Sequence, residues 1–120
     1  MKATISLIKG DGIGIDVSEA AMFLAEKAMV KAGIPAPNIV EIVAGASYFA
    51  ETGHDIQPGG EVAAGAADAI FLGAIGFPKI RHEDGTEISP HLRLRDRYQL
   101  YAGVRPVRAY PNVPMPLADP

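Results

Sequence analysis

Short apolar runs alternate with longer mixed stretches along the first two thirds of the chain. Residues 4–8 form the first run, which ends at Gly10, and residues 38–45 and 67–76 contain two more. An apolar run of this length, bounded by glycine, is typical of a strand buried on both faces, as in a parallel sheet. We therefore predict three strands.

The first connecting segment has the periodicity of a helix from residue 16 to residue 31. Asp16 and Glu19 have the spacing of a capping box at its start, and Gly33 followed by Pro35 ends it. Five of its apolar residues fall on one face of that helix: Val17, Ala20, Ala21, Leu24 and Ala28.

Two shorter helical segments, residues 47–53 and 59–67, separate the second and third strands. The alternation of strands and helices predicts βαβ units, that is, an α/β fold with a parallel or mixed sheet flanked by helices. Residues 77–88 are polar and contain turn residues, so we predict a loop there.

A last helix is predicted with Ser89 as its N-cap and Pro90 as its first residue, and it is expected to run to about residue 101. Residues 104–110 are expected to be extended, and the last ten residues contain four prolines. A proline-rich end of this kind is typical of a linker or of a crossing between domains.

The first strand ends in a glycine turn, Gly10-Asp11-Gly12-Ile13-Gly14, directly before the first helix. Backbone N–H groups at such a corner can bind a phosphate. The third glycine, however, comes one residue too early for the G-x-G-x-x-G pattern, and the carboxylate of Asp11 would repel a phosphate. We therefore predict a structural turn, with a nucleotide-binding turn as the alternative.

Composition narrows the class of protein. A chain of 120 residues is long enough for one domain with a core, and a formal net charge of −3 does not favour nucleic acid as a partner. The absence of cysteine excludes disulfides and thiolate chemistry. The apolar stretch at residues 4–8 is too short for a signal peptide or for a membrane span of about 20 residues. We expect a cytoplasmic protein without a membrane partner.

The predicted last helix has arginines on two sides. Arg93 and Arg97 share one face, and Arg95 lies about 200° from Arg93, because each residue turns about 100°. His91 is one turn before Arg95 on the same side, so this pair has the spacing to bind an anionic ligand such as a carboxylate. The alternative is a solvated basic helix, which is our interpretation of Arg93 and Arg97.

Three motifs together resemble a known family: IKGDGIGIDV at residues 8–17, FLGAIGFPK at 71–79 and LRLRDRYQLYAGVRPV at 92–107. Their order and separation resemble the N-terminal part of the metal-dependent decarboxylating dehydrogenases of β-substituted malates, which include isopropylmalate, isocitrate, homoisocitrate, tartrate and D-malate dehydrogenases. The tail at residues 105–118 resembles the tartrate and D-malate branch most. The resemblance implies an isopropylmalate-dehydrogenase-like fold, not a Rossmann fold, in which the glycine turn is a structural corner.

The resemblance assigns substrate binding to four residues. Arg95 and Arg105 match the family's arginines that bind the carboxylates of the malate portion. Ser89 matches a serine of isocitrate dehydrogenases that meets their substrate's extra carboxylate, and His91 stands where isopropylmalate dehydrogenases have an apolar residue. D-malate or tartrate is therefore favoured as the 2-hydroxy acid substrate, then isocitrate, and isopropylmalate last.

The resemblance also implies a turn near the nicotinamide at Gly73, Ala74 and Ile75. The complete enzymes use NAD or NADP with Mg²⁺ or Mn²⁺, but their catalytic Tyr and Lys, their metal-binding Asp residues and their adenosine-binding loop match no position up to 120. We therefore expect no catalytic residue and no metal ligand in this chain, and alone neither a bound cofactor nor dehydrogenase activity. Ile15 and Gly103 depart from the family's usual Pro and Asn.

The organisation of the chain follows from the same resemblance. Residues 1–105 are expected to be the N-terminal part of a large α/β domain, which is incomplete, and residues 106–120 a proline-rich crossing toward a missing second domain. Apolar surface would then stay uncovered, so we expect a homo-oligomer or a missing C-terminal segment. Two alternatives stay open: a non-catalytic assembly or interaction piece, and a stand-alone nucleotide-binding module.

Overall fold

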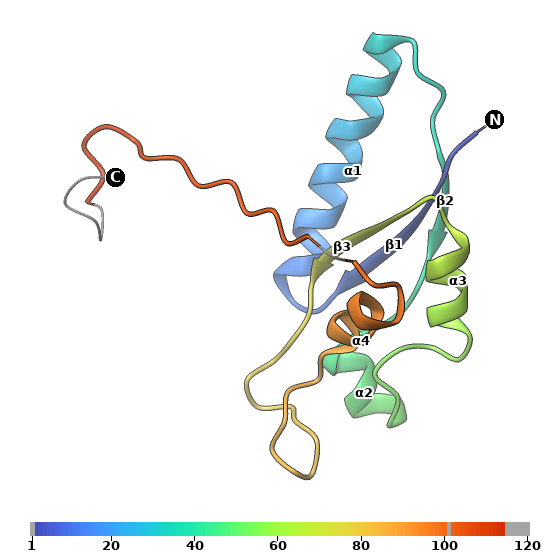
Figure 1. The fold of residues 1–120 in the computed structure, drawn as a ribbon, viewed down its shortest axis with the longest axis vertical. Coiled ribbons are helices and arrows are strands. Elements are labelled where there is room, and N and C mark those ends of the chain that lie inside the picture. Colours follow the sequence, from blue (N-terminus) through green and yellow to red (C-terminus); the bar gives the residue numbers. More distant parts are fainter. Residues whose placement is uncertain (1, 101, 115–120) are drawn as a thin grey trace.

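The computed structural model describes residues 2–100 and 102–114 and contains a three-stranded parallel sheet in the order β2-β1-β3 (Figure 1). The strands are β1 (Thr4–Gly10), β2 (Asn38–Glu41) and β3 (Ala69–Ala74). β1 runs parallel to both of its neighbours. The chain between consecutive strands therefore has to cross back to the end of the sheet at which the strands start, as it does in the predicted βαβ units. The predicted α/β fold with a parallel sheet is confirmed.

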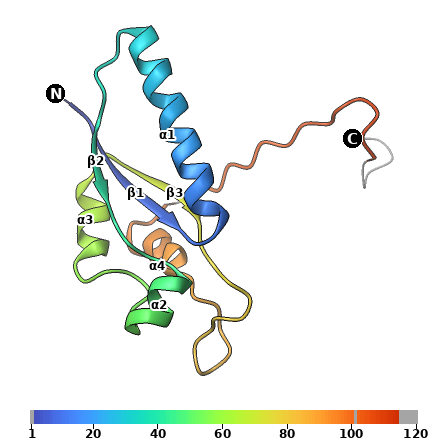
Figure 2. The same cartoon turned by 180° about the vertical axis from the view of Figure 1, so that it is seen from behind.

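Helices lie on both sides of this sheet (Figure 2). On one side, α1 (Ile13–Ala32) packs on β1 and β3. On the other side, α3 (Gly60–Ala66) packs on β3, and α4 (Pro90–Arg97) lies close to α3. The short helix α2 (Ala46–Thr52) lies beyond the carboxyl ends of the strands (Figure 1).

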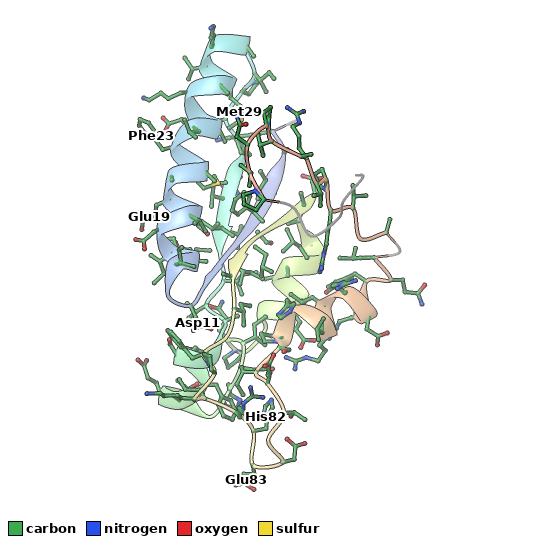
Figure 3. The ribbon with its side chains drawn as sticks, turned by 90° about the vertical axis from the view of Figure 1, so that its left-hand side faces the viewer. Asp11, Glu19, Phe23, Met29, His82 and Glu83 are labelled. Carbon is green, nitrogen blue, oxygen red and sulfur yellow. The ribbon has the colours of Figure 1, made fainter. Side chains whose placement is uncertain are left out.

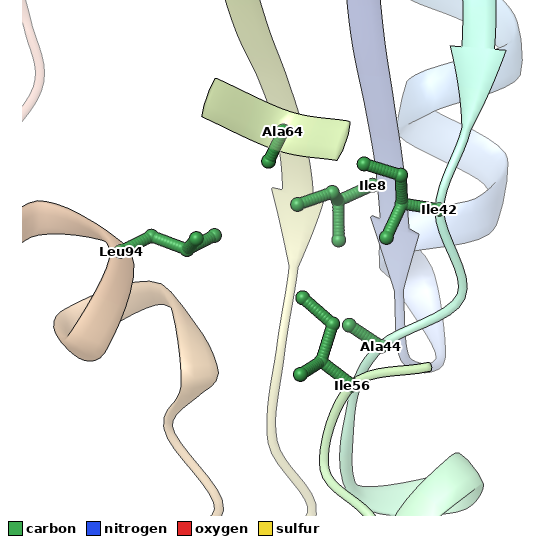
Figure 4. Packing of buried hydrophobic residues seen from close by; sticks show 6 residues of the cluster. All are labelled: Ile8, Ile42, Ala44, Ile56, Ala64 and Leu94. Atoms are coloured by element: carbon green, nitrogen blue, oxygen red, sulfur yellow. The ribbon is translucent and has the colours of Figure 1, made fainter. Parts of the chain in front are cut away.

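Alternation along β1 divides its side chains between the two layers. Leu7 and Lys9 lie on the α1 side, whereas Ser6 donates its hydroxyl hydrogen bond to the carbonyl oxygen of Ala63 in α3, at 3.3 Å. Ile8 is fully buried on the α3 side. It belongs to the core cluster shown in Figure 4, which contains Ile8, Ile42, Ala44, Ile56, Ala64 and Leu94.

The start of α1 differs from the prediction. The helix begins at Ile13, three residues before Asp16, and no side chain caps it, so the capping box of Asp16 and Glu19 is wrong. The cause is the glycine turn: Gly10 and Gly12 both have positive φ and turn the chain from strand to helix within two residues. Glu19 forms an ion pair with Lys9 instead, at 3.5 Å.

Most of the large apolar side chains of α1 are exposed, whereas the half-buried Met22 and Met29 line a hollow together with Leu7 of the sheet. The residues of α1 that are buried are Gly14 and Ser18, whose small size lets the helix approach β3 closely. Figure 3 shows Phe23 projecting outward from α1. Much of the predicted apolar face, including Val17 and Leu24, is therefore exposed; the exposed large apolar residues of α1 are Ile13, Ile15, Val17, Phe23, Leu24 and Val30. None of the described helices is long and apolar enough to span a bilayer.

The helix α4 begins as predicted and ends early. Ser89 precedes it and Pro90 is its first residue, but the helix stops at Arg97 rather than near residue 101. Gln99 takes the left-handed conformation, with φ of 48°, and the N–H of Leu100 donates to the carbonyl oxygen of Arg95 at 3.0 Å, which closes the helix in a Schellman motif.

Beyond α4, residues 102–114 run outward from the body of the molecule (Figure 1). This described stretch contains no helix or strand, and Val104 and Val107 are 83% and 92% exposed. The radius of gyration is 17.0 Å, against about 14 Å for a compact chain of this length. The segment is extended, as predicted; most of the proline-rich end, residues 115–120, lies outside the described residues, as does Tyr101.

We expect Gly73→Ala to lower the free energy of unfolding by about 2 kcal/mol, because the added methyl group overpacks a filled site. A Cβ at Gly73 would lie 2.4 Å from the carbonyl oxygen of Lys9 and 2.5 Å from the hydroxyl of Ser18. Gly103→Ala is the matched control, since a Cβ there has no neighbour within 4 Å among the described residues. Urea unfolding of both variants measures the effect, and equal midpoints would contradict the assigned packing.

Candidate functional site

The glycine turn is a tightly packed corner between β1, α1 and β3. A Cβ at Gly10 would lie 2.0 Å from the carbonyl oxygen of Ala74, and one at Gly14 would lie 2.3 Å from that of Lys9. The N–H of Asp11 donates to the Ala74 carbonyl oxygen at 2.6 Å. Glycine is therefore required at Gly10 and Gly14 for close backbone approach, without any need for a phosphate.

The carboxylate of Asp11 joins three segments of the chain. It accepts hydrogen bonds from the backbone N–H groups of Ala46 (2.7 Å) and Ser47 (2.8 Å) in α2, and from that of Gly76 (2.9 Å) after β3. The residue is only 3% exposed. Burial alone would raise the pKa of this carboxyl, but the amide hydrogen bonds outweigh it and hold the pKa below its ordinary value. Asp11 is thus an ionised structural anchor (Figure 3).

The same corner offers little to a phosphate. The N–H groups of Gly14 and Ile15 already donate to the carbonyl oxygens of Asp11 and Gly12, at 2.8 and 3.2 Å. The buried negative charge of Asp11 stands beside them. This geometry agrees with the structural role expected for the turn and disfavours the nucleotide-binding alternative.

Gly73, Ala74 and Ile75 lie at the carboxyl end of β3. Gly73 is closed off by its neighbours, and the carbonyl oxygen of Ala74 is bonded to Asp11. Ile75 lines a hollow of about 200 Å³ together with Phe77 and Ile88. Pockets that enclose a ligand are usually about 300–1,000 Å³, so this hollow fits at most one end of a cofactor. A nicotinamide role for these three residues stays a prediction.

The helix α4 rests on the core through one side only. Leu94 and Pro90 are buried, and Leu94 points from α4 toward Ile8 and Ile56 (Figure 4). The arginines flank this buried side on the helical wheel: Arg93 lies to one side of it and Arg95 to the other. The two flanks have different surroundings.

Arg93 and Arg97 are ion-paired rather than solvated alone, which corrects the sequence interpretation. Arg93 makes two hydrogen bonds to the carboxylate of Asp55, at 2.8 and 2.9 Å, and a third to Glu61. Arg97 pairs with the other carboxylate oxygen of Glu61 at 2.6 Å. The hydrogen bonds from Arg93 lower the pKa values of Asp55 and Glu61 although burial opposes them.

His91 and Arg95 occupy the opposite flank. Within the described residues, no side-chain hydrogen bond or ion pair involves Arg95, which is exposed, and His91 is half-buried with its Nδ1 atom covered and without a hydrogen-bond partner. Burial, and then the nearby charge of Arg95, lower the pKa of His91, so its ring is neutral at pH 7. Among residues 2–100 and 102–114, this flank thus has a cation without an ion-pair partner and a polar ring atom without a hydrogen-bond partner.

Of the two other predicted substrate residues, Ser89 lies at the start of the helix that carries Arg95, whereas Arg105 lies apart from it. Ser89 adjoins the helix and keeps its position as N-cap, but its hydroxyl makes no capping hydrogen bond, so this oxygen is not used by the helix. Arg105 lies in the exposed stretch that leaves the body. The structure thus groups Ser89, His91 and Arg95 on one short helix and leaves Arg105 apart.

The remaining histidines do not form a metal centre. His82 packs edge-on against the ring of Phe49, with centroids 5.0 Å apart, and the carboxylate of Asp84 accepts hydrogen bonds from Thr86 in its own turn. Residues 77–88 form the predicted loop, closed by a single antiparallel bridge between Arg81 and Glu87. Among residues 2–100 and 102–114, no three His, Asp or Glu side chains are grouped so that they could hold a metal ion.

Sequence reasoning missed the anchors Asp11, Asp55 and Glu61. The only signal for the latter two is the i, i+4 pair Arg93 and Arg97, which needs acidic partners if it is to pack rather than be solvated. Nothing in the sequence places those partners, because they are 32 to 38 residues away.

Comparison with known proteins gives a consistent result. Residues 4–119 match the isocitrate/isopropylmalate dehydrogenase family. A 3-isopropylmalate dehydrogenase of Symbiobacterium thermophilum is 34% identical, over 96% of this chain and 30% of the relative. A tartrate dehydrogenase/decarboxylase of Pseudomonas putida and a decarboxylating D-malate dehydrogenase of Escherichia coli K12 are each 29% identical, over 96% and 95% of this chain and 32% of each relative. The chain spans about a third of the length of these relatives.

Proposed function

The chain belongs to the isocitrate/isopropylmalate dehydrogenase family, and we propose that it forms part of the substrate site of a decarboxylating dehydrogenase that acts on a 2-hydroxy acid of the malate type. In this proposal Arg95 binds a substrate carboxylate, for which its planar fork of donors is suited. Arg105 is proposed to bind a second carboxylate once its segment folds against further protein. Ser89 and His91 meet the substituent on the third carbon.

The polar ring of His91 supports D-malate or tartrate over isopropylmalate. Its Nδ1 atom is already covered by the protein, so a substituent of the substrate would meet the rest of the ring. An isopropyl group packed on the ring would remove water from its other nitrogen without giving that atom a hydrogen bond, which costs about 1–3 kcal/mol, whereas a hydroxyl group or a water molecule retained beside a small substituent would give it a partner. Isopropylmalate dehydrogenases are among the relatives at 34% identity, so this preference rests on His91 and on the tail at residues 105–118, and not on overall similarity.

The proposed contribution of this chain is to bind and orient the substrate. The complete enzyme is proposed to use NAD or NADP as the hydride acceptor and Mg²⁺ or Mn²⁺ as a Lewis acid. No three His, Asp or Glu side chains of the described residues are grouped so that they could hold a metal ion, and the metal ligands are therefore proposed to come from further protein. Residues 1–105 are accordingly proposed as part of a large domain and residues 106–120 as a crossing, with the exposed apolar face of α1 covered by a second copy or by further protein.

The test is a titration of the chain with D-malate and, separately, with 3-isopropylmalate, followed by amide chemical shifts in ¹H–¹⁵N NMR spectra. We expect D-malate to shift the amides of α4 and to bind about tenfold more tightly than 3-isopropylmalate, since the unpaired polar group opposes the latter. His91→Leu should reverse this order. Equal affinities that the substitution does not change would reject the proposed substituent preference, and no shift in α4 with either acid would reject this helix as the site.

A further inference from the structure

A short helix at the edge of a small core can rotate about its own axis unless contacts hold its flanks. We call this rotation the roll of the helix. α4 has eight residues, too few to be stable alone, and only Leu94 and Pro90 are buried from it. Side chains extend about 5–6 Å from a helix axis, so a roll of about 10° would move a side-chain tip by about 1 Å. An arginine that must meet a carboxylate in a fixed geometry is sensitive to such a displacement.

The flank of α4 opposite Arg95 is held by a polar cluster, defined as Asp55, Glu61, Arg93 and Arg97. The side chains of Asp55 and Glu61 are 16% and 19% exposed, whereas those of Arg93 and Arg97 are 47% and 49% exposed. The acids are thus largely covered and fixed, and the arginines close over them. Partly covered carboxylates that receive several charge-assisted hydrogen bonds in bidentate geometry define one arrangement better than single surface ion pairs do.

The C-terminal end of α4 is also held to α3, the helix that contains Glu61. The hydroxyl of Tyr98 donates to the carbonyl oxygen of Glu61 at 2.6 Å, and its ring lies directly over Gly65, where no side chain larger than hydrogen fits. Glu61 is therefore bonded to the neighbouring helix through both its side chain and its backbone. These contacts fix the roll of α4 about the buried Leu94.

We infer that Asp55, Glu61 and Arg93 are positioning residues, which lock the roll of α4 and so present His91 and Arg95 to the substrate carboxylate. The inference rests on the proposed function for what Arg95 binds, but the locking itself does not. The raised pKa of Arg93 and the lowered pKa values of Asp55 and Glu61 agree with strong pairing.

The experiment compares the whole chain with Asp55→Asn, Glu61→Gln and the conservative Arg93→Lys, and with Glu41→Gln as the control. Glu41 pairs with Lys9 at 3.4 Å and lines the hollow beside α1, on the other side of the sheet from α4, so the control also removes one acid from an ion pair. Residual dipolar couplings of the α4 amides report the orientation of the helix without any ligand. We expect them to change in the first three variants and to stay constant in Glu41→Gln.

D-malate affinity provides the second readout. We expect Asp55→Asn to weaken binding about fivefold, and to cause no further loss once Arg95→Ala is present, because Asp55 acts through Arg95. A merely structural role would lower stability and leave the affinity unchanged. Unaltered couplings in all three variants would overturn the inference, as would additive losses with Arg95→Ala. If the parent chain does not bind D-malate, the proposed function fails, while the couplings still decide whether the cluster locks α4.

Discussion

Replacing Asp11 with alanine is expected to lower the free energy of unfolding by about 4 kcal/mol, the largest stability loss we predict. Hydrogen bonds to a charged group contribute about 1.5–3 kcal/mol each, and the substitution removes three acceptor contacts at once. It also leaves the N–H group of Ala46, which is fully buried at the start of α2, without a partner. Urea unfolding at pH 7 measures the change.

Asp16→Ala is the matched control for Asp11→Ala. Asp16 is an exposed aspartate of the same segment, and its substitution should change stability by less than about 0.5 kcal/mol. Asp11→Asn keeps the shape of the side chain and one acceptor oxygen, so its loss of stability should lie between those of the control and of Asp11→Ala. It replaces Asp11→Ala in the comparison if the alanine variant does not fold. A loss for Asp11→Asn no larger than that for the control would contradict the anchor role.

The pH dependence gives an independent check on Asp11. Its pKa is lower in the folded protein than in the unfolded chain, so the folded state holds this proton less tightly. Its stabilising contribution is therefore complete above the unfolded value of about 3.9 and is lost as the pH falls through the folded value. The difference in stability between the parent chain and Asp11→Asn should shrink below about pH 4.

Local patterns were sufficient to predict the number and order of the strands, because short apolar runs bounded by glycine admit few other structures. The predicted end of the second strand was wrong: β2 ends at Glu41 and not near residue 45, since Ala44 pairs with Ile56 in a separate antiparallel bridge. The start of α1 was misplaced since capping signals at Asp16 and Glu19 compete with a glycine turn whose positive φ angles begin the helix earlier. The end of α4 was misplaced for a similar reason: Gln99 gives no sequence signal for the left-handed conformation that it adopts.

The candidate site was only half predictable. Helical spacing separated Arg95 and His91 from Arg93 and Arg97, since that depends on sequence distance alone. Helical spacing does not show which flank of α4 faces acidic side chains. That depends on Asp55 in the loop before α3 and on Glu61 in α3, which are more than 30 residues away from Arg93. The covered Nδ1 of His91 likewise follows from tertiary packing.

The second large effect is expected for Arg95→Ala, which should weaken D-malate binding about 50-fold, because truncating one partner of a charged hydrogen-bonded pair costs about 2–5 kcal/mol. Arg95 is the arginine of α4 that has no ion-pair partner among the described residues, so its guanidinium is available to a ligand without breaking a contact. Arg95→Lys keeps the charge but loses the two parallel hydrogen bonds, and should weaken binding about tenfold. Calorimetric titration with D-malate measures both variants.

Lys31→Ala is the control for net charge, since it removes one cation from the far end of α1 and should leave the affinity within about twofold. If it weakened binding as much as Arg95→Ala, the attraction would be a general effect of charge and Arg95 would not be a specific ligand. An equal loss for Arg95→Lys and Arg95→Ala would show that binding requires the guanidinium fork itself. That result would fit a carboxylate held by two parallel hydrogen bonds, and it would explain why the roll of α4 has to be fixed.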